Sequence, residues 1–249
     1  MFPKLLFIDS YTVMIFLGLV AAFALLEGYA AYIKANRLKL SYIELSAAIS
    51  ILIGFVGALL FENLYEFIKY GSEYSWTNSM TFFGGLITGV ACFALLYAFW
   101  LRKGSKGALA SMFPIAPACL AAAHGFGRIG CFLAGCCYGT PTSSWIGVIF
   151  PGMDGAVVPT NLIEAIFLLL LSAALAIVAF KRKSHITVPI YMVCYGAFRF
   201  VIEFYRGDER GSLIPGISPS QLWAILLFAI GAGLLISYIV RISRRNRNP

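Results

Sequence analysis

The chain has 249 residues, of which 60% are hydrophobic and only 12% are charged. Soluble globular domains carry about 25% charged residues, so this composition excludes an ordinary water-soluble enzyme, a disordered chain and a nucleic-acid-binding protein. The formal net charge is +8, from 19 basic and 11 acidic residues. Length and hydropathy together predict an all-α polytopic membrane protein that forms a single integral membrane domain over residues 1–249.

Seven apolar segments are long enough to cross a bilayer as helices, because a transmembrane helix needs about 20 apolar residues. They cover residues 11–33, 43–61, 81–101, 108–135, 161–180, 187–205 and 219–240. The stretches between them predict outer loops at about 62–80, 138–160 and 206–218.

Clusters of basic residues at the ends of these segments predict the orientation of the chain. Most of the lysines and arginines fall in four short runs, at 34–39, 102–106, 181–183 and 241–247. Cytoplasmic loops carry an excess of Lys and Arg. If all four runs are cytoplasmic, the N-terminus lies outside, the chain crosses the membrane seven times, and the C-terminus lies in the cytoplasm.

The fourth segment differs from the others because it is rich in proline and glycine, with Pro114 and Pro117 followed by five glycines between residues 125 and 139. Irregular backbone at membrane depth is tolerated only where protein or a wet cavity surrounds it, so we expect a functional site here. If residues 124–132 are helical, His124, Arg128 and Cys131 share one face. The imidazole can then act as a base beside a cation and a thiol, or it can simply hydrogen-bond a neighbouring helix.

Charged residues inside apolar segments cost at least about 2.5–3.5 kcal/mol each on insertion scales, so they are usually paired or functional. Arg199 and Glu203 are four residues apart and are expected to form an ion pair on one helix face, with Arg206 three residues further on. An arginine cluster suits the phosphate of a lipid, because a guanidinium donates hydrogen bonds in pairs and stays charged. A purely structural charge network between helices is the alternative.

The six cysteines fall into two groups. Three lie in apolar segments and are expected to be small core residues: Cys92, Cys119 and Cys194. Three form the pattern C-x4-C-C at the outer end of the fourth segment: Cys131, Cys136 and Cys137. This spacing fits no usual zinc pattern, so no metal site is expected. A disulfide on an oxidising face of the membrane and a reactive thiolate beside Arg128 both remain open.

Several stretches resemble signature segments of the bacterial prolipoprotein diacylglyceryl transferase family. They are SYTVM at 10–14, FFGGL at 82–86, HGFGRIGCFLAGCCYG at 124–139, VPTNLIEA at 158–165 and RFVIEFYRGD at 199–208. The order and spacing of these stretches agree with the family, as does the predicted topology of seven spans with the N-terminus outside. The resemblance covers about residues 11–240.

The resemblance implies a transferase in the bacterial cytoplasmic (inner) membrane. Such an enzyme moves a diacylglyceryl group from phosphatidylglycerol, or a similar anionic phospholipid, to the lipobox thiol in a prolipoprotein signal peptide or to another thiol acceptor, and it releases glycerol phosphate. We expect no cofactor. The residues at the family's motif positions imply a phospholipid-binding set: Arg128, Arg199, Glu203, Arg206, Tyr11, Glu164 and Asn161, the last of which stands where the family has a glutamine.

The chain departs from the family pattern at its polar positions, which indicates a diverged member. Phe83 stands where the family has a histidine, and three residues replace two asparagines and a glutamate: Cys131, Ala134 and Cys136. Since phenylalanine cannot accept a proton, the candidate catalytic set is His124 as base, Arg128 and Arg199 on phosphate, and Cys131, Cys136 or Cys137 as a nucleophile. The alternatives are thiol–disulfide chemistry at the cysteines and a non-catalytic lipid-binding protein.

Overall fold

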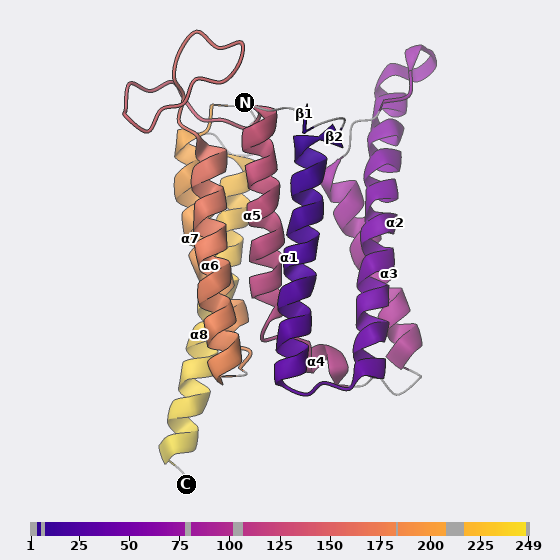
Figure 1. Cartoon of the computed structure of the whole chain (residues 1–249), viewed down its shortest axis with the longest axis vertical. Coiled ribbons are helices and arrows are strands. Elements are labelled where there is room, and N and C mark those ends of the chain that lie inside the picture. Colours follow the sequence, from indigo (N-terminus) through magenta and orange to yellow (C-terminus); the bar gives the residue numbers. More distant parts are fainter. Residues whose placement is uncertain are drawn as a thin grey trace. The chain divides into compact units, whose positions relative to one another are not determined.

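A computed structural model describes residues 4–5, 8–77, 81–101, 107–182, 184–207 and 217–247. Almost all regular structure in these ranges is helical (Figure 1), so the predicted all-α membrane fold is confirmed. A short antiparallel pair, β1 (Lys4–Leu5) and β2 (Ile8–Asp9), precedes the helices. The helices are α1 (Ser10–Tyr32), α2 (Arg37–Tyr70), α3 (Phe82–Leu101), α4 (Ala108–Met112), α5 (Ala116–Ala134), α6 (Thr160–Arg182), α7 (Thr187–Ile202) and α8 (Pro219–Arg247), with 3-10 turns η1 (Gly71–Glu73) and η2 (Glu203–Tyr205).

Each of the seven predicted segments contains one long helix. Five of these helices, α1, α2, α6, α7 and α8, are long and apolar enough to cross a membrane. The other two predicted segments hold α3, with 20 residues, and α5, with 19 residues. The count of seven spans, the outward N-terminus and the single membrane domain stay predictions.

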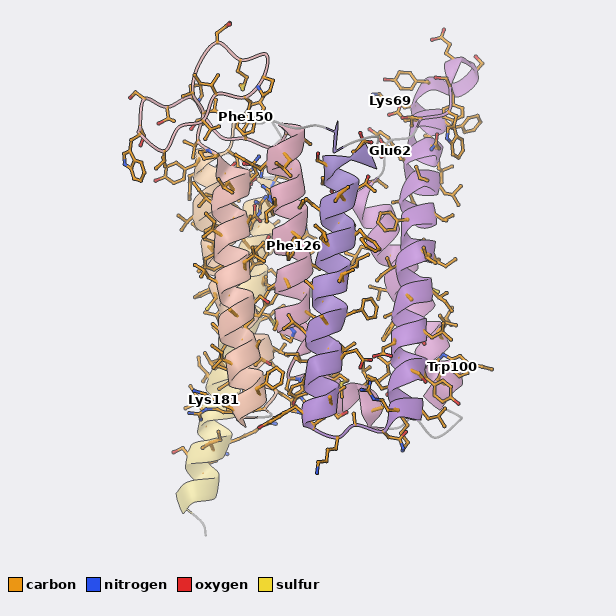
Figure 2. The ribbon with its side chains drawn as sticks, viewed as in Figure 1. Glu62, Lys69, Trp100, Phe126, Phe150 and Lys181 are labelled. Atoms are coloured by element: carbon orange, nitrogen blue, oxygen red, sulfur yellow. The ribbon has the colours of Figure 1, made fainter. Side chains whose placement is uncertain are left out.

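Two predicted boundaries are corrected by the structure. Helix α2 continues to Tyr70, so the first part of the loop predicted at 62–80 is helical, and Figure 2 shows Glu62 and Lys69 on this extension. Hydropathy placed the end of α2 too early, because the helical backbone hydrogen bonds continue past the apolar stretch. The helix ends before Gly71, whose φ of 55° is a conformation that glycine adopts readily. The predicted segment 108–135 is two helices, since Pro114 interrupts the chain between α4 and α5. The predicted loop 206–218 falls largely outside the described residues.

The contacts divide the chain into two compact units. The smaller unit, Ile33–Ser111, contains α2 and α3, which pack through small residues. A Cβ added at Gly54 would lie 3.1 Å from the carbonyl oxygen of Gly85, and one at Gly57 would collide with the side chain of Thr88. Such small residues allow close helix approach in the absence of a hydrophobic driving force in lipid.

The larger unit, Met1–Tyr32 with Met112–Pro249, is organised around α5. Helix α5 packs against α1 on one side and α6 on the other (Figure 1). A Cβ added at Gly18 would lie 2.9 Å from the carbonyl oxygen of Ala123, and one at Gly125 would lie 3.0 Å from Leu169. The Ser172 hydroxyl donates a hydrogen bond of 2.7 Å to the carbonyl of Ala118. The glycines of α5 therefore lie within regular helix, where they allow its neighbours to come close.

A long loop connects α5 to α6 and is pinned back onto the helix ends. The Gly139 N–H donates to the carbonyl of Val158 at 2.8 Å, and the Thr140 N–H donates to the carbonyl of Tyr205 at 2.9 Å. Phe150, labelled in Figure 2, is 1% exposed and anchors the loop against Phe132 of α5. These contacts bring the end of α5, the start of α6 and the end of α7 to one place.

Replacing Gly139 with alanine tests this junction, because an added Cβ would collide with the carbonyl of Tyr205 and lie 2.9 Å from that of Val158. Backbone atoms cannot move aside cheaply, so Gly139→Ala should lower the free energy of unfolding by about 1–3 kcal/mol. Thermal unfolding of the detergent-solubilised protein measures this effect. Gly155→Ala in the same loop is the matched control, since nothing lies within 4 Å of its added Cβ. Equal stability of the two variants would contradict the prediction.

Candidate active site

The candidate site is built around the carboxylate of Glu164, which is 1% exposed in the first turns of α6. One oxygen, Oε2, lies 2.9 Å from Arg128 Nε of α5 and 3.3 Å from Arg199 Nη1 of α7. The other oxygen, Oε1, accepts a hydrogen bond of 2.9 Å from the hydroxyl of Tyr195. Breaking a buried ion pair is strongly destabilising, since it leaves an uncompensated charge. This carboxylate therefore joins three helices at one point.

Arg199 connects that centre to a second carboxylate. Its Nη2 atom lies 2.8 Å from Glu203 Oε2, so the ion pair predicted from the four-residue spacing is confirmed. The same Nη2 donates to the hydroxyl of Ser220 at 3.2 Å, and the Ser218 hydroxyl donates to Glu203 Oε1 at 2.9 Å. The start of α8 is thus tied to the arginine of α7.

The N–H groups of the Arg128 side chain find only some of the hydrogen-bond partners that they need among the described residues. Its Nε approaches Glu164 at ion-pair distance, but the N–H direction does not meet hydrogen-bond geometry. Its Nη1 donates to the sulfur of Cys131 at 3.8 Å. Its Nη2 is buried and has no hydrogen-bond partner among the described residues. An unsatisfied buried donor costs about 1–3 kcal/mol, more for a charged group, and a phosphate oxygen would satisfy it.

His124 lies one helical turn before Arg128, and α5 is continuous through both, as the predicted shared face requires. Its Nε2 is 3.8 Å from Glu164 Oε1, and its ring makes an edge contact with Tyr195 at a centroid distance of 5.4 Å. The His124 side chain is 34% exposed, against 2% for that of Glu164. The imidazole is therefore the accessible edge of an otherwise buried cluster.

The three cysteines of the C-x4-C-C pattern converge at the end of α5. Their sulfur atoms all lie within 4.8 Å of one another. Cys131 is buried, while Cys136 and Cys137 keep some exposure, and all three are free thiols. The neighbouring thiols of Cys131 and Cys136, together with the guanidiniums of Arg128 and Arg206, hold the pKa of the Cys137 thiol below its ordinary value, although burial works in the opposite direction.

The remaining predicted residues surround this cluster in different ways. Tyr11 of α1 lies against Gly130, where an added Cβ would be 3.0 Å from its ring. Arg206 is 8% exposed, and its guanidinium helps to lower the pKa of the Cys137 thiol. Asn161 is fully buried: its amide donates to the carbonyl of Cys136 at 2.8 Å, and its oxygen accepts from the next N–H at 2.8 Å. The side chain of Phe83 is outside the described part of the chain.

Sequence reasoning missed three members of the network. Tyr195 is four residues before Arg199 and so shares its face of α7, a spacing that was available to find it. No spacing in the sequence pointed to Ser218 and Ser220. They lie at the start of α8 and reach Arg199 and Glu203 only because the helices pack together.

Comparison with known proteins supplies a family. Residues 3–237 match the family model described as prolipoprotein diacylglyceryl transferase. The chain is 32% identical over 250 residues to the phosphatidylglycerol–prolipoprotein diacylglyceryl transferase of Clostridium tetani, which covers 96% of this chain and 95% of that protein. It is 29% identical over 253 residues to the protein of that name from Geobacter sulfurreducens, with 96% and 92% covered. It is 37% identical over 174 residues to phosphatidylglycerol–prolipoprotein diacylglyceryl transferase 2 of Clostridium perfringens, with 68% and 65% covered.

Replacing Glu164 with glutamine tests whether this carboxylate holds the helices together. The change keeps the shape of the side chain but leaves two guanidiniums facing a neutral amide. Breaking a buried pair in this way costs about 3–5 kcal/mol, so the detergent-solubilised variant should melt at a clearly lower temperature. Glu73→Gln, on an exposed residue of η1, makes the same chemical change as a control. Equal melting temperatures for the two variants would refute the role given to Glu164.

Proposed function

Because the chain belongs to the prolipoprotein diacylglyceryl transferase family, we propose that it transfers a diacylglyceryl group from phosphatidylglycerol to the thiol of a prolipoprotein cysteine. The observation that carries the proposal is the buried cluster of Arg128, Glu164 and Arg199, with His124 at its accessible edge. The site of action is the bacterial cytoplasmic membrane, and the acceptor lies in the signal peptide of the prolipoprotein.

The arginines hold the phosphate of the lipid. Glu164 orients the guanidiniums of Arg128 and Arg199 through contacts of 2.9 Å and 3.3 Å. Arg128 Nη2 then takes one phosphate oxygen, since it lacks a partner among the described residues. Arg199 is held in position by Glu203, and Tyr11 borders the cluster on α1. Arg206 and Asn161 act one step away, because they fix the loop that follows α5.

The reaction is a direct displacement at the carbon of the diacylglyceryl group that is joined through oxygen to the phosphate. His124 takes the proton of the acceptor thiol, and the sulfur forms a bond to that carbon. The carbon–oxygen bond to phosphate breaks, and its electron pair leaves with glycerol phosphate. The arginines stabilise the charge that develops on the leaving phosphate, where preorganised donors have their largest effect.

The cysteines of this chain are not required as nucleophiles in this scheme. The product is a thioether, and a diacylglyceryl group bound to Cys131, Cys136 or Cys137 would be held by the same stable bond. A thiolate is a poor leaving group from carbon, so such an adduct would not pass its lipid to the acceptor. Radiolabelled lipid retained on these cysteines after denaturation would favour their predicted covalent role instead.

Replacing Arg199 with lysine tests the phosphate site, because lysine keeps the charge but loses the planar fork. The transfer rate should fall by about 100-fold or more, as when one transition-state donor is removed. The assay follows labelled diacylglyceryl groups moving from phosphatidylglycerol in detergent micelles to a lipobox peptide. Arg241→Lys, on an exposed residue near the end of α8, is the matched control. If Arg199→Lys is as active as this control, Arg199 does not hold the phosphate.

Replacing His124 with glutamine tests the base. Loss of a positioned base lowers rates by about 100- to 10,000-fold. The defect should shrink as the pH rises above about 8.5, where a free thiol ionises without help. His185→Gln is the control, since this second histidine is exposed and lies outside the cluster. A defect that is the same at every pH would show that His124 does not remove the thiol proton.

The two alternative functions predict different results, with thiol–disulfide exchange measured in its own assay and lipid binding in the transfer assay above. Thiol–disulfide chemistry, favoured by the three close sulfurs, would be lost in Cys136→Ser and survive Arg199→Ala. A lipid-binding protein without turnover would retain phosphatidylglycerol on the arginines and produce no labelled peptide with any variant.

A further inference from the structure

The proposed transfer leaves the cluster of three thiols unexplained. We propose that Cys131, Cys136 and Cys137 bind one soft metal ion through three thiolates, and that monovalent copper is the ion that fits best. The proposal does not depend on the proposed transfer activity. The cysteine spacing argued against a zinc site, which uses four ligands. The site proposed here needs only three.

The distances suit three-coordinate binding. A metal–sulfur bond of about 2.3 Å places three sulfurs around one ion roughly 4.0 Å apart when they lie in a trigonal plane with it. The three sulfurs of the chain all lie within 4.8 Å of one another before any ion is bound. Closing the site therefore needs only side-chain adjustment. Thiolates select soft ions such as monovalent copper, whereas structural zinc sites are almost always four-coordinate.

The surrounding charges suit the complex that would form. Three thiolates around a monovalent ion carry two negative charges in total, and they are accompanied by two guanidiniums. Arg128 Nη1 donates to the sulfur of Cys131 at 3.8 Å, and the positive charge of Arg206 acts on the Cys137 thiol. Such outer contacts orient ligands and offset their charge, which is how metal sites are commonly tuned.

The backbone holds the three thiols in place before an ion arrives. Gly135, with a φ of 74°, ends α5 and turns the chain so that the Cys136 N–H donates to the carbonyl of Cys131 at 3.0 Å. Thr160 and Asn161 at the start of α6 donate to the carbonyls of Cys137 and Cys136, at 3.1 Å and 2.8 Å.

Cys137 itself has a φ of 60°. Residues other than glycine seldom adopt this left-handed conformation, and where they do, the strain is typically found at functional sites and ligand clamps. The strained backbone at Cys137 thus directs a third thiol to the cluster. A cysteine that only filled space in the protein would not need this strained conformation.

The test is a competition for copper in the absence of lipid. The full-length protein, reduced and kept anaerobic in detergent, is titrated into monovalent copper held by the coloured chelator bicinchoninic acid. The expected result is removal of one copper per chain, seen as loss of the chelator's colour. Cys136→Ser and Cys137→Ser should each weaken binding by at least tenfold, and Arg206→Lys should weaken it about 10-fold through lost ligand support.

Cys119→Ser is the matched control, because Cys119 also lies on α5 but outside the cluster, and this variant should bind copper as the unchanged protein does. Circular dichroism checks that each serine variant is folded. Three outcomes would overturn the proposal: the chelator keeps all of the copper, the folded Cys136→Ser variant binds as tightly as Cys119→Ser, or zinc displaces copper at equal concentration.

Discussion

The structure of the larger unit depends on one buried carboxylate. Glu164 compensates Arg128 from α5 and Arg199 from α7, and all three side chains lie among apolar helices. Charges in such an environment are stable only when they are paired with good geometry, so each helix has to present its residue at the same depth. Glu203 extends the pairing to the hydroxyls at the start of α8. One electrostatic requirement therefore sets the register of four helices.

The pairing also suits the phosphate binding that we propose for this site. The two arginines are held rigidly because Glu164 and Glu203 together balance their charges. Among the described residues the Nη2 donor of Arg128 has no hydrogen-bond partner, so the proposed phosphate can accept from it. A rigid donor contributes more to a developing charge than a mobile one, because little reorganisation is needed during the reaction. His124 is exposed at the edge of this rigid cluster, where an acceptor thiol could reach it.

Arg128 links the charged cluster to the cysteines, since it contacts both Glu164 and Cys131. The cysteines are kept there by the loop after α5, whose backbone approaches that of Tyr205 so closely that position 139 has to be glycine. Asn161 shows how this chain differs from the family pattern. It stands at the family's glutamine, and here its amide is used to hold the carbonyl of Cys136.

The sequence by itself determined the features that depend on neighbours along the chain. Apolar length located the seven long helices but not the short α4, and helical spacing correctly placed Arg199 beside Glu203 and aligned His124 with Arg128. Only the tertiary structure decided that Glu164 would be the shared partner of both arginines and that three sulfurs would meet within 4.8 Å. The physical reason is that helices apolar on every side carry no periodic signal for their inward face. Contacts between them arise from packing and from the need to pair buried charge, which no local pattern records.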